Sequence, residues 1–205
     1  LWSPGGQTTE DLTGLTAGTY TVTVTDANTS TGTITVTITE PAVISISGVL
    51  TYHNTANTSM NNVTIQLKQG ASVIYTTTTL TNGSYSFTPV CPGTYDVAFS
   101  TGKSVGGINS TDAGQVNGWF AAGPLGTYPS IERVRYHAGD VDNDTWLVTT
   151  DAGLIQSYYI NNYSPPFNPL WEFWKQGESV TGQPQVVTLP QIVVPISSPP
   201  IVQNF

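Results

Sequence analysis

The chain has 205 residues and a net charge of −8 at pH 7, from 13 acidic and five basic residues. Charged residues make up 9% of it, against about 25% in an ordinary soluble domain. So few basic residues exclude a nucleic-acid surface, which needs clustered Lys and Arg, and exclude docking on anionic lipid.

Residues with hydroxyl groups are abundant in this chain, in place of charged residues. The chain contains 33 threonines, 20 glycines and 14 prolines. Threonine favours strands, and glycine and proline favour turns, so the composition predicts a mainly β fold. No apolar run reaches 18 residues, so no membrane insertion is expected. This composition is typical of an extracellular, cell-surface bacterial protein, and a first residue other than Met is typical of a processed or fragmentary chain.

Residues 1–41 contain one hairpin pattern. Tyr20–Thr25 and Thr33–Thr39 alternate apolar residues with threonine, and Asp26–Gly32 forms the turn between them. Glu40-Pro41 ends the unit, because proline cannot continue a central ladder. Two strands cannot bury two sheet faces, so this segment is predicted to be part of a sandwich.

The same segment resembles the second half of an immunoglobulin-like repeat found in large surface adhesins of Bacteroidetes, including gliding-motility adhesins. The resemblance lies in residues 1–6, 9–15, 17–22 and 38–41. It implies that the first strands of the repeat would precede Leu1. Their absence would leave an apolar groove beside one of the two strands.

Residues 42–101 form a second β unit. Strands are predicted near residues 43–52, 63–68, 73–80, 84–87 and 95–99, with an Asn82-Gly83 turn. Residues 47–49, 62–67, 82–87 and 92–97 resemble the B-type repeats of collagen adhesins and their carboxypeptidase-regulatory-like relatives. The resemblance implies a small immunoglobulin-like sandwich that acts as a stalk. The Lys–Asn isopeptide bond of some relatives is not carried over, since no lysine with a placed acidic partner matches.

Residues 102–164 contain an internal repeat. The segment Asn109–Gly114 returns 39 residues later as Val148–Gly153. Each copy continues into a helical pattern, carried by Gln115, Val116, Trp119 and Phe120 and by Leu154, Ile155, Tyr158 and Tyr159. Ser110 or Thr111 and Thr149 or Thr150 are the predicted N-caps. Two equivalent helices are expected to pack face to face.

A calcium-loop spacing precedes the second helix. Counted from Asp140, carboxylates fall at positions one, three, five and twelve, as Asp140, Asp142, Asp144 and Asp151. Alternate side chains at this spacing converge on a hard cation that prefers oxygen ligands. Trp146 at position seven would add its backbone carbonyl. The sequence therefore predicts a Ca²⁺ site, with a solvated turn that binds nothing as the alternative.

This loop resembles the calcium loops of dockerins, which also have Asp at position twelve and only a following helix. Two residues depart from that pattern. Thr145 stands where glycine usually makes the sharp turn, and Val148 offers no side-chain oxygen. The first copy lacks the carboxylates, and we expect hydrogen bonds of Asp112 and Asn109 to hold it without a cation.

Residues 165–205 form a proline-rich extended tail with a strongly apolar segment. We expect this segment to insert into the first domain of the next subunit, as an added strand, which would propagate as a head-to-tail filament. The predicted donor residues are Val186, Val187, Leu189, Ile192, Val193, Val194 and Ile196. The alternative is that the tail folds back within its own chain.

No catalytic motif is present in the sequence, so no enzyme is predicted. Glu172 and Glu178 beside Trp171 and Trp174 have two interpretations, a sugar-cleaving pair or aromatic packing on the two helices, and packing is favoured.

The predicted fold is therefore mainly β, with tandem immunoglobulin-like sandwiches, a dockerin-like two-helix calcium module and an extended tail. The predicted function is that of a non-enzymatic extracellular structural or adhesive protein, rigidified by Ca²⁺ and self-assembling into filaments. A surface scaffold or a carbohydrate is a further expected partner. The alternative is a dockerin-type binding module that attaches a larger secreted protein through the helix faces beginning at Ser110-Thr111 and Thr149-Thr150.

Overall fold

A computed structural model describes the chain except residues 41–42, 124–126, 165–168, 187 and 197–198. Among these described residues strands dominate and the three helices are short, which confirms the predicted mainly β class. The chain divides into two compact units, Leu1–Ala42 and Val43–Phe205, which we call unit 1 and unit 2. Within the described residues, every helix is too short or too polar to cross a membrane.

Unit 1 is one antiparallel sheet in the order β1-β2-β3. Its strands are β1 (Trp2–Ser3), β2 (Gly18–Thr25) and β3 (Thr31–Ile38), so the hairpin is where the alternation predicts it. Threonines pair across one face, where the Oγ1 atoms of Thr21 and Thr35 lie 2.9 Å apart. The other face carries the apolar residues.

The apolar face of unit 1 is uncovered within the unit. The exposed fraction is 63% for Val24, 67% for Ile34 and 53% for Val36. These are large values for β-branched residues that alternate so regularly, because such residues usually face a core. The described part of unit 1 therefore supplies one sheet with a free apolar face.

Unit 2 is built on a two-sheet sandwich. The strands from the predicted second β unit are β4 (Ile44–Val49), β5 (Val63–Gln69), β6 (Ser72–Thr78), β7 (Ser84–Val90) and β8 (Gly93–Thr101). One sheet has the order β11-β8-β5-β6 and the other β12-β4-β7. All five predicted strands are present.

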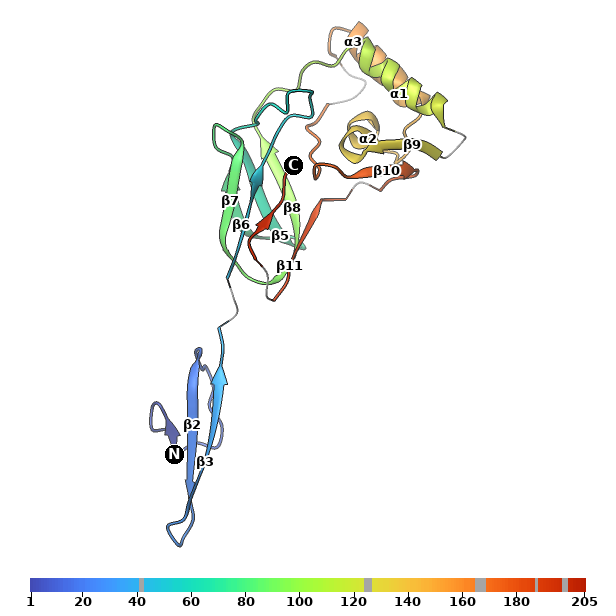
Figure 1. Ribbon diagram of the computed structural model, residues 1–205. Coiled ribbons are helices and arrows are strands. Elements are labelled where there is room, and N and C mark those ends of the chain that lie inside the picture. The colour runs from blue at the N-terminus through green and yellow to red at the C-terminus, as the bar shows by residue number, and fades with distance from the viewer. Residues whose placement is uncertain (41–42, 124–126, 165–168, 187, 197–198) are drawn as a thin grey trace. The chain divides into compact units, whose positions relative to one another are not determined.

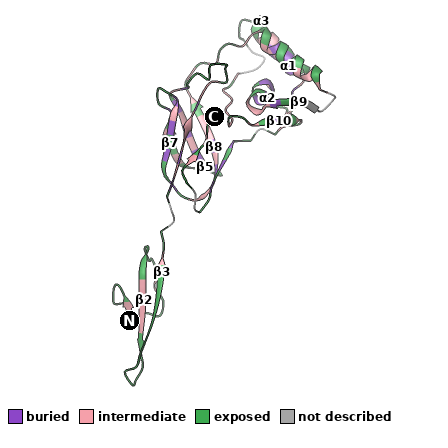
Figure 2. Cartoon of the chain, viewed as in Figure 1, coloured by how far each residue is buried: buried purple, intermediate pink, exposed green. Residues whose placement is uncertain are grey.

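The sandwich core follows from the period-two pattern of its strands. In β5, Val63, Ile65 and Leu67 are fully buried, while the residues between them are partly exposed. Buried residues gather on the inner faces of both sheets (Figure 2). Lys103, just after β8, donates from Nζ to Asn61 Oδ1 at 2.9 Å.

The C-terminal tail completes this sandwich. Its strand β11 (Gln191–Val194) pairs antiparallel with β8, and β12 (Ile201–Val202) pairs parallel with β4. Figure 1 shows β11 beside β8 within one chain. The last residue, Phe205, is 5% exposed in the same core.

This position differs from the expected insertion into a neighbouring copy, and it is the alternative in which the tail folds back. The physical reason is that β8 and β4 offer unpaired edges in the same chain, so the tail reaches them without a second molecule. Ile192 and Val194 are buried there. The other predicted donor residues, Val186, Leu189, Val193 and Ile196, are exposed, and Val187 lies outside the described residues.

The chain between β8 and the tail forms a helical module. Helices α1 (Ser110–Ala122) and α3 (Thr149–Ile160) lie side by side, as the repeat predicts (Figure 1). Their N-caps are Asn109 and Val148, each just before the predicted residues. Buried Val116 and Ile155 lie in their shared core.

Three elements of the module were not predicted. They are β9 (Thr127–Glu132), α2 (Arg133–Gly139) and β10 (Ser179–Gly182). Strands β9 and β10 pair antiparallel, and this pairing brings residues that follow the proline-rich segment back to the module.

Candidate calcium site

The predicted calcium loop connects α2 to α3. Asp140 caps the end of α2, and Asp151 lies in the first turn of α3. Carboxylate oxygens of Asp140, Asp142 and Asp144 lie within 4.8 Å of one another. The structure therefore brings together three of the four predicted carboxylates.

Each of these three carboxylates accepts a hydrogen bond from a backbone N–H of the loop. Asp140 Oδ1 accepts from the N–H of Asp144 at 3.2 Å, and Asp140 Oδ2 accepts from the N–H of Thr145 at 3.1 Å. Asp144 Oδ1 accepts from the N–H of Trp146 at 2.7 Å. Asp142 and Asp144 are exposed, whereas Asp140 is 2% exposed.

The loop makes its sharp turn at the residue where dockerin-like loops have glycine. Thr145 has φ of 78°, and Asn143 has φ of 57°. A positive φ is tolerated by asparagine but strained for a β-branched residue. The strain at Thr145 lies at the centre of the loop, where the backbone reverses around the carboxylates.

Asp151 lies outside the close group formed by the other three. It is fully buried, and its Oδ1 and Oδ2 accept from the N–H groups of Val141 and Val148, both at 2.9 Å. It thus joins both ends of the loop to the start of α3, where the helix dipole also favours an anion. Within the described residues it is not part of the close carboxylate group.

The first copy of the repeat contains the same capping bond. Asp112 Oδ2 accepts from the N–H of Asn109 at 2.8 Å, and Asn109 Oδ1 accepts from the N–H of Thr111 at 2.8 Å. This reciprocal capping box confirms the predicted hydrogen bonds of Asp112 and Asn109.

The electrostatics of the loop favour a bound cation. Burial, together with the charges of Asp151, Asp144 and Asp142, raises the pKa of Asp140 to about 6 against the lowering effect of the Thr145 N–H. Burial also raises the pKa of Asp151. Clustered carboxylates with such pKa values repel one another, and a divalent cation among them would remove that repulsion.

Residues C-terminal to α3 form hydrogen bonds with the backbone of the calcium loop. Gln183 Oε1 accepts from the N–H of Leu147 at 2.8 Å and from the hydroxyl of Tyr136 at 2.9 Å. The N–H of Gln185 donates to the carbonyl of Thr145 at 3.0 Å. Leu147 is fully buried, as the inward apolar anchor of such a loop should be. No sequence signal indicated Gln183, because the contact depends on the unpredicted pairing of β9 with β10.

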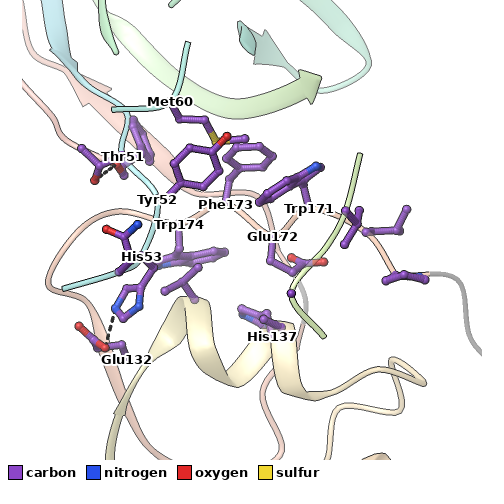
Figure 3. A pocket seen from close by; sticks show the side chains of 18 of the residues that line it. Thr51, Tyr52, His53, Met60, Glu132, His137, Trp171, Glu172, Phe173 and Trp174 are labelled. Carbon is purple, nitrogen blue, oxygen red and sulfur yellow. Dashed lines mark hydrogen bonds and ion pairs between the residues drawn. The ribbon is translucent and has the colours of Figure 1, made fainter. Parts of the chain in front are cut away.

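A cavity of about 800 Å³ lies between the sandwich and the module in unit 2 (Figure 3). Five Phe, Tyr or Trp side chains line it: Tyr52, Trp171, Phe173, Trp174 and Phe205. Trp171 and Phe173 pack against the sandwich core, while the ring of Trp174 lies 5.2 Å from that of His137 in α2. The aromatic cluster therefore joins the sandwich to α2, whereas the packing interpretation expected it on α1 and α3.

The polar groups in the cavity are unevenly paired. His53 Nε2 lies 2.7 Å from Glu132 Oε2, whereas neither ring nitrogen of buried His137 has a hydrogen-bond partner. Burial raises the pKa of Glu172. Glu178 accepts from Trp174 Nε1 at 2.6 Å and pairs with Lys175 at 3.3 Å, so Glu178 stabilises the junction between the module and its aromatic cluster.

The comparisons with known proteins agree with part of the predicted resemblance. Residues 51–121, about a third of the chain, match the family model of the SdrD B-like domain. The match spans β5 to β8 and most of α1, and it confirms the B-type resemblance for the sandwich.

Among the solved structures that are similar to this chain are two of the major pilin subunit BcpA of Bacillus cereus, one of them a variant. The sequence identity is 16% in each, with TM-scores of 0.31 and 0.32. The alignments cover 42% of this chain and 29% of the pilin, so less than a third of the pilin is represented. No curated protein matches the sequence.

Proposed function

We propose that this chain is a structural or adhesive module of an extracellular bacterial surface protein. The observation that carries the proposal is the SdrD B-like match over the sandwich strands. The low charge and high threonine content agree with it. Immunofluorescence on intact cells tests it: antibody against the folded chain should label unpermeabilised cells, and labelling only after permeabilisation would contradict the proposal.

We further propose that the loop from Asp140 to Asp151 binds one Ca²⁺ and rigidifies the module. Asp140, Asp142 and Asp144 would hold the ion through their carboxylates. Trp146 would contribute its carbonyl, and Asp151 lies close enough to influence the pKa of Asp140. The ion would supply positive charge that fixes α2 against α3.

Head-to-tail self-assembly is the finer part of the proposal. The free apolar face of unit 1, with Val24, Ile34 and Val36, is a surface on which a strand of a second copy could pack. If the tail is the donor, β11 and β12 must first leave their own sandwich. A surface scaffold or a carbohydrate is proposed as an additional partner.

A reversible cross-link tests whether the tail is the donor. Val193 pairs with Thr94 across β11 and β8, so Val193→Cys with Thr94→Cys in a Cys91→Ser background would lock the tail in its own chain. The matched control joins β5 to β6 through Thr64→Cys and Thr78→Cys, which also face each other. We expect the oxidised tail-locked protein to remain monomeric and the control to form filaments. Filaments of the oxidised tail-locked protein would exclude tail exchange.

The second candidate function is dockerin-type attachment to a scaffold. The observation that favours it is the shared capping bond of Asp112 and Asp151, which gives α1 and α3 equivalent starts. The hydroxyl residues there, Ser110-Thr111 and Thr149-Thr150, are exposed. Ser110→Arg combined with Thr149→Arg should abolish binding of the full chain to whole cells without changing its melting temperature. Unchanged binding would exclude these faces.

A further inference from the structure

The first and last strands of unit 2 are parallel neighbours. Ile201 pairs with Ile46 and Val202 with Ser47, so β12 runs beside β4 in the same direction. The chain enters unit 2 before β4 and reaches its C-terminal residue just after β12 (Figure 1). In a parallel pair these two points lie at opposite ends of the shared edge.

Backbone hydrogen bonds extend this pairing beyond the two strands. The N–H of Gln203 donates to the carbonyl of Ser47 at 2.9 Å, and the N–H of Phe205 donates to the carbonyl of Val49 at 3.1 Å. The N–H of Thr51 donates in turn to the carbonyl of Phe205 at 3.0 Å.

Side chains reinforce the same edge. Asn204 Oδ1 accepts from the N–H of Val49 at 3.0 Å, and the hydroxyl of Tyr85 donates to the carbonyl of Gln203. The ring of Phe205 lies 5.0 Å from that of Phe99, inside the sandwich core. The last residues are thus anchored by backbone, amide and aromatic contacts together.

We propose that the β4–β12 edge is a tension-bearing clamp, an inference that rests on the proposed structural role. Tension applied across unit 2 pulls β4 and β12 in opposite directions along their common axis. All hydrogen bonds between them then carry the load at once and must break together. In a pair pulled apart from one end, the same bonds would break one after another at lower force.

The clamp leaves the helical module outside the path of the force. Residues 102–184, with the calcium loop, are inserted between β8 and β11. Tension passes from β4 directly to β12 and reaches the module only after the clamp has broken. The structure therefore separates load bearing from cation binding, although both lie in one compact unit.

Gly48 provides a specific way to weaken the clamp. A Cβ added there would lie 1.8 Å from the carbonyl oxygen of Gln203 and 2.7 Å from its carbonyl carbon. Only glycine lets the tail approach β4 so closely. Gly48→Ala should displace the tail, whereas Gly153→Ala is the matched control, because a Cβ at Gly153 meets no atom within 4 Å.

Single-molecule pulling of the full chain between its two ends tests the clamp. Under the same constant force, Gly48→Ala should unfold unit 2 at least about tenfold faster than the unaltered protein, the factor expected for one or more lost hydrogen bonds. Gly153→Ala should unfold at the unaltered rate. If Gly48→Ala does not fold, Asn204→Ala serves instead, since it removes one acceptor of the clamp and no core side chain. An unchanged rate in whichever variant folds would overturn the proposal.

Two further arms use the unaltered protein. Attachment at the exposed Cys91 in place of the C-terminal end loads β4 and β7 at one end, where Ile44 pairs with Val90, and should lower the rupture force markedly. Addition of a calcium chelator should leave the end-to-end rupture force unchanged. Equal rupture forces in the two pulling geometries would exclude the clamp. A clear fall of the rupture force with chelator would exclude its separation from the module. Neither result would bear on surface location or self-assembly.

Discussion

Asp140 and Asp151 are two almost fully buried carboxylates at opposite ends of one loop, and burial and then the charge of Asp151 raise the pKa of Asp140 to about 6. Each also accepts two backbone hydrogen bonds. The loop is therefore shaped by its own carboxylates, whose repulsion is largest when all of them are ionised.

The first prediction is that a chelator lowers the melting temperature at pH 7. A ligand bound only by the folded state stabilises it, by about 2.7 kcal/mol at a hundredfold excess over Kd. Asp142→Ala should lose most of this effect, because its exposed side chain belongs to the carboxylate group and supports only one loop N–H. Differential scanning calorimetry with and without chelator measures both changes.

Asp112→Ala is the control for the calcium effect. Its carboxylate caps α1 in the first copy of the repeat, so the substitution should cost about 1 kcal/mol. The shift caused by chelator should remain. Superimposable melting curves with and without chelator for the unaltered protein would show that the loop binds no stabilising calcium.

The second prediction concerns pH. A folded-state pKa of about 6 for Asp140 lies above its ordinary value of 3.8, so the folded state binds more protons than the unfolded state between these values. Without calcium, the stability that Asp140 contributes to the folded protein is lost as pH rises from 4 to 7, by up to about 3 kcal/mol. Calcium requires ionised carboxylates, so its stabilisation should grow over the same range. Chelator should thus shift the melting temperature much less at pH 5 than at pH 7, and an equal shift at both would contradict this.

Local patterns predicted the elements whose signal is contained in a few neighbouring residues. The alternation in Val63–Gln69 gives a buried strand because side chains point to opposite faces with period two. The spacing of Asp140, Asp142 and Asp144 likewise gave the carboxylate group. Asp151, also predicted as a ligand, lies outside the close carboxylate group in the described residues and accepts two backbone N–H groups at the start of α3.

The elements that were missed depend on contacts between distant residues. Helix α2 has seven residues, too few for a periodic pattern, and its position is fixed by the pairing of β9 with β10. The apolar tail was expected to insert into a neighbouring copy, but it follows the alternative and pairs within its own sandwich. Its sequence could not show which edge it would join, because every unpaired strand edge offers the same backbone groups.

The third prediction concerns His137, whose ring nitrogens are both buried without a partner. Burial, and then the charge of Arg133, lower its pKa. Its contribution to stability is therefore present above the ordinary pKa of about 6.5 and is lost as pH falls below it, since the unfolded state then binds the extra proton. His137→Phe keeps a ring against Trp174 and should remove this acid-dependent loss.

Chemical denaturation at several pH values between 5 and 7 measures the effect. The unaltered protein and His137→Phe should differ in the slope of unfolding free energy against pH, in the presence of chelator to silence the calcium loop. His53 is paired with Glu132 on the surface, so His53→Phe is the control for a general loss of imidazole. Equal slopes for the unaltered protein and His137→Phe would show that His137 binds protons equally in the folded and unfolded states, so that folding does not lower its pKa.

The last prediction concerns the aromatic anchor of the tail. Phe205 is 5% exposed and packs beside Tyr85 and Phe99, whereas Val202, three residues earlier, is 72% exposed. Phe205→Ala should cost about 3–5 kcal/mol, because it leaves a cavity in the sandwich core. Val202→Ala should change the unfolding free energy by no more than about 0.5 kcal/mol, since its side chain faces solvent. Urea denaturation compares the two, and a similar small effect for both would mean that the tail does not complete its own sandwich in solution.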